Sequence, residues 1–259
     1  TLGGILLQGN FLFDGSKSEL KNFRYIKESF GIYNERGGTI GWYIDNDVIV
    51  VIDSQFPDTA KNFHNNLKSV SLQKIDYLFN THHHNDHTMG NYYLKDFTET
   101  IIAHNNCIRL QEKHNKGKET ENQVVKANLT FNSEISISLP KEKIMAKHFG
   151  KAHTGGDIVI QFENLNVVHL GDLVFNNVYP YIDNFAECSV EGWIEVSDKI
   201  VNYYGKDTKY IFGHAESTES VIGNKSDLTR MRDYLENLHN YVKKLIANGR
   251  SKEDIANTD

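Results

Sequence analysis

Short runs of β-branched and aromatic residues alternate with amphipathic stretches along most of the chain. Runs bounded by Gly and by Asn or Asp predict strands, and Asp45-Asn46-Asp47 predicts a hairpin turn between two of them. Apolar residues at helical spacing predict helices over 58–70, 190–205 and 226–248, the last with an apolar stripe expected to pack. The predicted strands fall within 22–26, 31–38, 39–53, 74–81, 100–108, 135–139, 143–150, 157–163, 165–172 and 208–214.

The order of these elements predicts an α/β fold in which two stacked sheets lie between helical layers. A doubly wound nucleotide-binding fold is disfavoured, because neither GxGxxG nor GxxxxGK[ST] occurs in the chain. No linker, repeat or low-complexity tract interrupts the pattern, so we expect one domain over residues 1–259. The charged stretch 109–127 is typical of an exposed helix or flap.

The composition of the chain argues against several classes of function. The chain has 28 basic and 34 acidic residues and a net charge of −6, which argues against a broad nucleic-acid footprint. No run approaches the roughly 18 apolar residues of a membrane span. Cys107 and Cys188 form neither a disulfide framework nor a CxxC zinc site. The first residue is Thr, which fits an exported, periplasmic protein after signal-peptide removal, although a shortened chain would look the same.

Candidate chemistry is concentrated in the stretch THHHNDHT, residues 81–88. A predicted strand ends here, and successive side chains of extended backbone point to opposite sides, so His82 and His84 face the same way. Asp86 and His87 begin a turn from which they could reach a second ion. Zinc needs three or four converging N, O or S ligands, so this stretch alone cannot complete two sites.

The missing ligands are predicted at other strand ends. His153, Asp172 and His214 each stand beside glycine at the edge of a predicted strand. Glycine at such positions lets backbone segments approach closely. The whole set of polar residues resembles one metal centre assembled from distant parts of the chain.

The order HxHxDH at 82–87, then His153, Gly171-Asp172 and Gly213-His214, resembles the metallo-β-lactamase superfamily. The resemblance covers about residues 39–215 and implies a four-layer αβ/βα sandwich with two zinc ions per chain. It implies that His82, His84 and His153 bind one ion, that Asp86, His87 and His214 bind the other, and that Asp172 bridges them. It also implies that Asp53 braces the metal loop from behind.

Three residues or turns refine the resemblance. Asp172 stands where broad-spectrum β-lactamases of the family commonly have Cys or Ser, and Asp there resembles glyoxalase II and lactonases. The turn after His153 reads TGGD, not the TPGH frequent in those thioesterases. His84 stands where flavo-diiron relatives tend to have an acidic residue, which favours zinc over redox iron.

The expected function is hydrolysis of a small-molecule substrate that contains an activated carbonyl, either a β-lactam-like amide or a lactone ring. A hydroxide that bridges the two metal ions would attack this carbonyl. Asp86 and Asp172 are the catalytic candidates, with Asp86 orienting the hydroxide and moving a proton. The alternative is a glyoxalase II-like thioester hydrolase. In that case the basic residues of the C-terminal tail would bind the glutathione part of the substrate. A phosphodiesterase or nuclease, and a non-enzymatic zinc-binding module, rank lower. Nucleic-acid and membrane partners are not expected, and the oligomeric state stays open.

Other candidates have plainer interpretations. We expect His83 to pack or hydrogen-bond behind the loop, and His104, His169 and Trp193 to be core residues. The aromatic segment 175–185 follows Asp172 directly, so it fits ordinary packing and a wall of the substrate pocket equally well.

Overall fold

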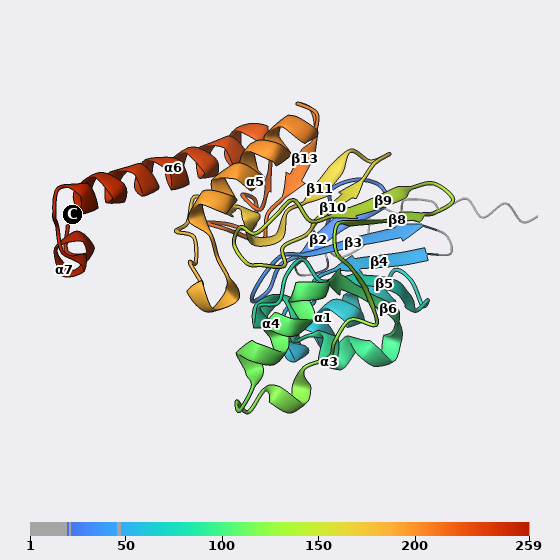
Figure 1. The fold of residues 1–259 in the computed structure, drawn as a ribbon. Helices are drawn as coiled ribbons and strands as arrows, with labels where there is room; N and C mark the ends of the chain where they lie inside the picture. Colours follow the sequence, from blue (N-terminus) through green and yellow to red (C-terminus); the bar gives the residue numbers. More distant parts are fainter. Residues whose placement is uncertain (1–19, 21, 46–47, 259) are drawn as a thin grey trace, which may run out of the picture.

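Two mixed sheets, packed face to face, form the centre of the computed structural model, which describes residues 20, 22–45 and 48–258 (Figure 1). The first sheet has seven strands and the second has six. In spatial order the first contains β1 (Phe23–Tyr25), β2 (Phe30–Tyr33), β3 (Ile40–Asp45), β4 (Val48–Ile52), β5 (Ile75–Phe79), β6 (Thr98–His104) and β7 (Leu129–Phe131). The second contains β15 (Ile222–Gly223), β13 (Lys209–Ile211), β11 (Val167–His169), β10 (Val159–Phe162), β9 (Lys143–Lys147) and β8 (Glu134–Ser138).

Each sheet combines antiparallel strands with a parallel part. In the first sheet β1 to β4 pair antiparallel, and β4, β5, β6 and β7 pair parallel. In the second sheet the single parallel pair among the described strands is β11 with β13. Asp45 pairs with Val48, which confirms the predicted hairpin, although Asn46 and Asp47 lie outside the described residues.

Helices cover the outer face of each sheet, which makes the four layers of the predicted αβ/βα sandwich (Figure 1). Beside the first sheet lie α1 (Pro57–Lys68), α3 (Asn91–Leu94) and α4 (Asn105–Asn115). Beside the second lie α5 (Val190–Tyr203) and α6 (Lys225–Ala247). The remaining helical elements are α2 (Asn85–Thr88), α7 (Lys252–Ala256) and the short 3-10 turns η1 (Lys95–Phe97), η2 (Glu121–Gln123), η3 (Gly171–Leu173) and η4 (Asn184–Ala186).

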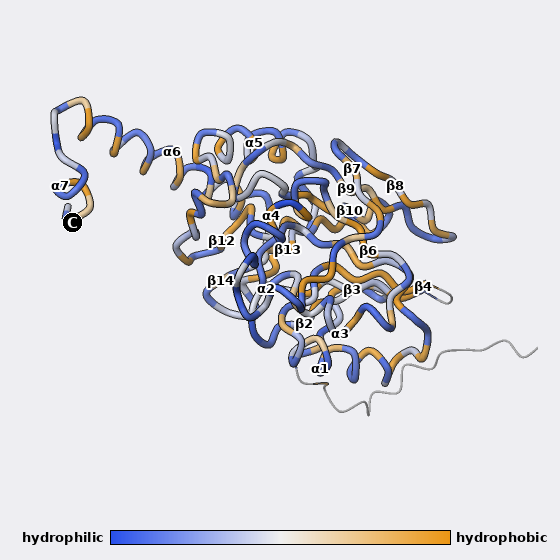
Figure 2. The backbone as a smooth tube through the Cα atoms, turned by 60° about the horizontal axis from the view of Figure 1, so that its bottom comes forward, coloured by the Kyte–Doolittle hydropathy of each residue, from blue (hydrophilic) through white to orange (hydrophobic). Residues whose placement is uncertain are grey.

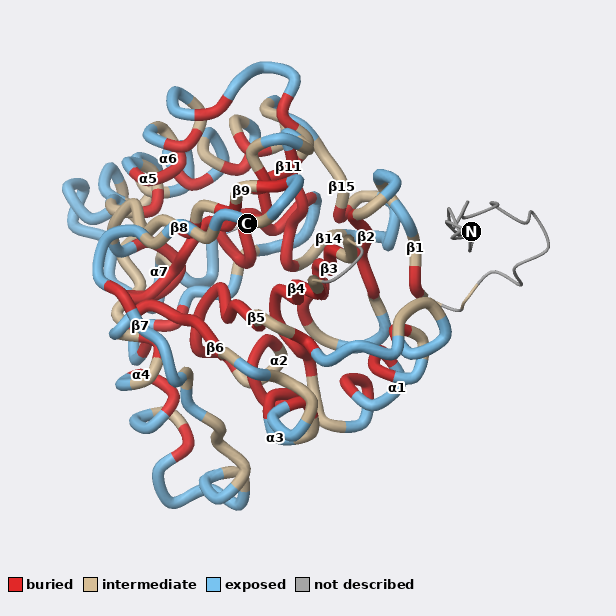
Figure 3. Tube along the Cα trace, turned by 90° about the vertical axis from the view of Figure 1, so that its right-hand side faces the viewer, coloured by how far each residue is buried: buried red, intermediate tan, exposed pale blue. Residues whose placement is uncertain are grey.

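Three apolar clusters hold these layers together. Phe79 and Phe162 belong to the cluster between the two sheets. Phe63 on α1 packs with Trp42 on the far face of the first sheet, and Trp193 on α5 packs with Tyr210 on the far face of the second. The buried residues therefore follow the sheets and the inner helix faces, while the outer helix faces are exposed (Figure 3).

The strand predicted over 100–108 is wrong in its second half. β6 ends at His104, and α4 begins at Asn105. The His104 imidazole caps this helix, because its Nδ1 accepts a hydrogen bond from the Asn106 backbone N–H at 3.2 Å. The helix therefore starts inside the apolar run that resembled a strand, and Cys107 is buried on its inner face.

The C-terminal helix is as long as predicted but packs only in part. Leu228, Met231 and Leu235 are buried, whereas Leu238 is 41% and Ile246 is 59% exposed. The outer part of α6 and all of α7 extend away from the sandwich (Figure 1), and hydrophobic positions continue along this projecting part (Figure 2). Among the described residues, no helix is long and apolar enough to cross a bilayer.

Two leucines of α6 test this division of the helix. Leu228→Ala should lower the free energy of unfolding by about 2–5 kcal/mol, because it opens a cavity in a packed cluster. Leu238→Ala, with the same chemistry on an exposed turn, should change it by no more than about 0.5 kcal/mol. Urea unfolding of both variants measures the difference. Equal losses would mean that the projecting part of α6 is covered in solution.

Candidate metal centre

Loops that follow parallel strands bring the candidate ligands to one edge of the sandwich. β5 ends at Phe79, and the chain then runs through His82 and His84 into α2. Asp172 follows β11, and His214 begins β14 (His214–Ala215), which pairs parallel with β12 (Phe175–Asn176). His153 lies in the turn before β10. Because carboxyl ends of parallel strands share an edge, residues far apart in sequence meet here.

His82, His84 and His153 form the first cluster. The Nδ1 atom of His84 lies 3.0 Å from the Nε2 atom of His82 and 3.0 Å from the Nε2 atom of His153. All three side chains are buried. The ligand atoms of these three residues and Asp172 all lie within 4.8 Å of one another, so three imidazole nitrogens converge as they would around one metal ion.

Asp86, His87 and His214 form the second cluster. The Nε2 atom of His214 lies 3.1 Å from Oδ2 of Asp86 and 3.3 Å from Nε2 of His87. His87 is fully buried, whereas Asp86 and His214 are partly exposed. This cluster therefore offers two nitrogens and one carboxylate on the side that solvent reaches.

Asp172 lies between the two clusters. Its Oδ2 atom is 3.6 Å from Nε2 of His153 and 3.4 Å from Nε2 of His214, and its Oδ1 atom is 3.0 Å from Nε2 of His87. Oδ1 is buried and accepts no hydrogen bond from any described residue. A buried carboxylate is costly unless positive charge compensates it, and either a protonated imidazole or a metal ion can supply that charge. The donor set and this buried carboxylate, whose Oδ1 makes no hydrogen bond of regular geometry with the described residues, both fit divalent metal ions.

The chain approaches Asp172 so closely that glycine is required at 213. A Cβ built on Gly213 would lie 1.9 Å from Oδ1 of Asp172, so any larger residue would displace the carboxylate. The backbone N–H of Gly213 also donates to the carbonyl of Gly171 at 2.7 Å, which ties the two ligand loops together.

Asp53 lies behind both clusters and hydrogen-bonds to two residues of the loop that follows β5. Its Oδ2 accepts from Nδ1–H of His87 at 2.7 Å and from the Thr81 hydroxyl at 2.8 Å. The Thr81 oxygen in turn lies 3.0 Å from Nδ1 of His82. Asp53 is fully buried at the end of β4. It therefore orients His87 directly and His82 through Thr81, leaving Nε2 of each ring free to face the centre.

Asp183 has the corresponding role for His84, and the sequence analysis missed it. Its Oδ2 lies 3.1 Å from Nε2 of His84, and its Oδ1 accepts from the backbone N–H of Phe185 at 2.9 Å. Nε2–H of His84 therefore donates to Asp183, and Nδ1 is the atom that faces His82 and His153. No motif marks an isolated aspartate in an aromatic loop, so only the three-dimensional contact identifies it.

The two clusters differ in electrostatics. Burial lowers the pKa of His82 well below its ordinary value and lowers that of His153 to about 3, so both rings are neutral near pH 7. Burial also opposes protonation of His87 and His214, but the Asp172 carboxylate outweighs it. The pKa of His87 is raised well above its ordinary value and that of His214 to about 9. A metal ion must therefore displace protons from His87 and His214 but not from His82 or His153.

A groove opens beside the second cluster. Its volume is about 430 Å³, within the range of small-molecule sites. Asp86, Asp172 and His214 form its polar floor, and Phe56, Phe175 and Tyr181 form aromatic walls. Both interpretations of the segment 175–185 hold in part, because Phe175 and Tyr181 line the groove and Phe175 also packs in the cluster that contains Trp193.

Comparisons with known proteins identify the family of the chain. A model of the metallo-beta-lactamase superfamily matches residues 35–233, well over half of the chain. The chain belongs to this superfamily. Metallo-beta-lactamase IND-1 of Chryseobacterium indologenes is 26% identical over 208 residues, which cover 76% of this chain and 80% of that protein. Metallo-beta-lactamase type 2 of Elizabethkingia meningoseptica is 21% identical over 214 residues, covering 81% and 83%.

Solved structures of the superfamily confirm the predicted fold. The metallo-beta-lactamase from Pontibacter korlensis has a TM-score of 0.68 with this chain at 16% sequence identity. The match covers 83% of this chain and 98% of that one. The four-layer sandwich is therefore shared although most side chains differ.

The structure brings together all seven residues predicted as ligands: His82, His84, Asp86, His87, His153, Asp172 and His214. The predicted core histidines also have hydrogen-bond partners, because Nε2–H of His104 donates to the carbonyl of Asn132 and Nε2–H of His169 to that of Thr39. Trp193 is fully buried, with its ring 5.2 Å from that of His153. His83 is buried beside His84, with ring centroids 4.4 Å apart, and it lines a side pocket described below.

Metal affinity should depend on pH differently in the two clusters. Because the pKa values of His87 and His214 are raised, the second cluster holds protons at about pH 6 that a metal must displace. The affinity for one of two zinc equivalents should fall about tenfold per pH unit for each proton released as pH drops from about 9 to about 6. Zinc titration monitored by calorimetry tests this. Equal pH dependence of both equivalents would contradict it.

Two aspartate-to-asparagine variants test which histidines Asp53 and Asp183 orient. Asp53→Asn removes the negative charge and one of the two oxygens that accept from His87 and Thr81, and it keeps a residue that tolerates the positive φ of 61° at this position. Both zinc equivalents should therefore weaken by roughly 10–100-fold. Asp183→Asn should weaken only the equivalent that contains His84. Competition with a chelating dye measures both constants. Unchanged affinities in Asp53→Asn would remove the assigned role.

Proposed function

We propose that the protein is a dinuclear zinc hydrolase that cleaves an activated carbonyl in a small molecule, a β-lactam-like amide or a lactone ring. The observation that carries the proposal is the position of Asp172 between two ligand clusters at the floor of a groove. The superfamily membership supports it, as do the names of the relatives, which are metallo-beta-lactamases.

The donor atoms favour zinc. The two clusters offer imidazole nitrogens and carboxylate oxygens, and neither includes cysteine. Zinc sites in hydrolases commonly use such nitrogen and oxygen ligands, whereas structural zinc sites prefer closed sets rich in cysteine. Zinc ions held by these residues would polarise a carbonyl oxygen and lower the pKa of a water toward 7.

Asp86 is the residue best placed to handle a proton. Its Oδ2 contacts His214, and its side chain lines the groove. Burial would raise the pKa of Asp86, but the charge of His87 and the hydrogen bond from His214 lower it overall. Asp86 is therefore ionised near neutral pH, and its carboxylate can orient a water molecule and take up the proton that the water loses.

The groove favours a compact substrate with a flat, apolar part. Phe175 stacks on His214, with ring centroids 5.4 Å apart and an interplanar angle of 13°. Tyr181 lies edge-on to His84 at 5.6 Å. These rings hold an apolar ring system against the polar floor and keep bulk water from the side walls.

A glyoxalase II-like thioesterase is the second candidate. Basic residues near the C-terminus would suit glutathione, but two of them are engaged. Arg230 contacts Asp227 at 2.8 Å, and Arg232 contacts Asp233 at 2.9 Å. These ion pairs make the two arginines less available to bind glutathione, so the thioesterase is the less favoured candidate.

Removing one predicted ligand tests the proposal. His153→Ala should lose one zinc equivalent and lower hydrolysis by more than about 100-fold, since the first cluster retains two of its three imidazoles. Metal analysis should accompany assays with a chromogenic cephalosporin, an N-acyl-homoserine lactone, S-lactoylglutathione and a phosphodiester.

His239→Ala is the matched control, because His239 lies on α6 and pairs with Glu191 outside both clusters. It should retain both zinc equivalents and full activity. Wild-type turnover that survives exhaustive chelation would contradict a metal-dependent mechanism. Cleavage of the phosphodiester alone would contradict the substrate class.

A further inference from the structure

A second cavity opens beside the metal groove, on the side of His84. Its volume is about 250 Å³. His114 and Tyr181 line both this side pocket and the groove, so the two spaces adjoin at these residues. Sites for whole drug-sized ligands have volumes of about 300–1,000 Å³. The side pocket is therefore large enough for one substituent of a substrate, and the groove is large enough for the part of the substrate that reacts.

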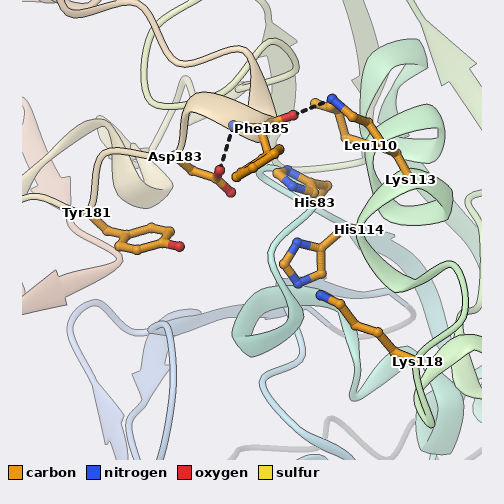
Figure 4. A pocket seen from close by; sticks show the side chains of 8 residues that line it. All are labelled: His83, Leu110, Lys113, His114, Lys118, Tyr181, Asp183 and Phe185. Atoms are coloured by element: carbon orange, nitrogen blue, oxygen red, sulfur yellow. Dashed lines mark hydrogen bonds between the residues drawn. The ribbon is translucent and has the colours of Figure 1, made fainter.

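Apolar and basic side chains together line the side pocket. Leu110 on α4 and Phe185 in the aromatic loop supply apolar surface. Lys113 and Lys118, from α4 and the turn after it, supply two ammonium groups (Figure 4). Tyr181 lies across the pocket from His114 (Figure 4).

The one carboxylate in the lining is already compensated. Oδ1 of Asp183 accepts backbone N–H groups from Phe185 and Ala186, and Oδ2 accepts from His84. Lys113 is partly engaged as well, because its Nζ donates to the carbonyl of Phe185 at 2.7 Å. The ammonium of Lys118 has no hydrogen-bond or ion-pair partner among the described residues. Two lysines against one carboxylate leave the lining with one positive charge in excess.

We infer that the side pocket binds a carboxylate-bearing substituent of the substrate, with Lys118 as the specificity-determining residue. The inference rests on the proposed function, because it assigns the acyl side chain of the hydrolysed substrate to this pocket. The apolar stem of the substituent lies against Leu110 and Phe185, and its carboxylate lies near Lys118. The preferred substrates are activated amides or lactones whose side chain carries a second acidic group.

The expected energy is that of a solvent-exposed ion pair, since both lysines are exposed. Removing Lys118 should change a preference by roughly two- to fivefold. The same preference should weaken as sodium chloride rises from about 20 mM to about 500 mM, because salt screens exposed charges.

Benzylpenicillin and its α-carboxy derivative, carbenicillin, form a matched pair that differs by one carboxylate. For each zinc-loaded variant the measured quantity is the ratio of kcat/KM for carbenicillin to kcat/KM for benzylpenicillin. Lys118→Ala should lower this ratio roughly two- to fivefold, and Lys118→Glu should lower it further through repulsion. Lys116→Glu is the control, because Lys116 carries the same charge in the same turn and does not line the pocket.

A binding measurement separates this inference from the proposed function. Calorimetry with phenylmalonate and phenylacetate on the zinc-loaded protein gives the same ratio without turnover. If the zinc-loaded protein hydrolyses neither penicillin, nor the cephalosporin, nor the lactone, but the phenylmalonate preference depends on Lys118, the proposed function fails and the side pocket stands. If the penicillins are hydrolysed and Lys118→Glu and Lys116→Glu change both ratios equally, the side pocket assignment is overturned and the hydrolase stands.

Discussion

The burial of one carboxylate among four imidazoles is the constraint on which the rest of this structure depends. Asp172 is only 4% exposed, and nitrogens of His82, His87, His153 and His214 lie 3.0–3.8 Å from its oxygens. Such a group is stable in the interior only when positive charge compensates it. Protonated His87 and His214 can supply that charge without metal, and divalent ions can supply it with metal. Metal binding and protonation therefore compete for the same carboxylate.

The fold meets this constraint by separating packing from chemistry. The three apolar clusters lie between and outside the sheets, whereas the polar centre lies at the strand ends. Asp53 and Asp183 hold the imidazoles from behind, so the ring nitrogens that face the centre are oriented before any ion arrives. The aromatic loop then contributes to both functions, because Phe175 and Tyr181 form the groove walls and Asp183 orients His84.

Much of this could be predicted from the sequence because it depends on local order. The ligands stand at strand ends beside glycine, and that pattern is visible in letters such as HLGD and FGH. The role of Asp183 could not be predicted, because it depends on a contact between residues 99 positions apart. The start of α4 was also invisible, since the apolar run before it suits either a strand or a helix until His104 caps the turn. The apolar stripe of α6 does not reveal where its packing partner ends.

X-ray diffraction at the zinc absorption edge, from crystals of the zinc-loaded protein, tests the central claim most directly. The account predicts two anomalous peaks, one among His82, His84 and His153 and one among Asp86, His87 and His214, with Asp172 between them. A single peak, or a peak between His83 and Asp183 in place of these two, would contradict it.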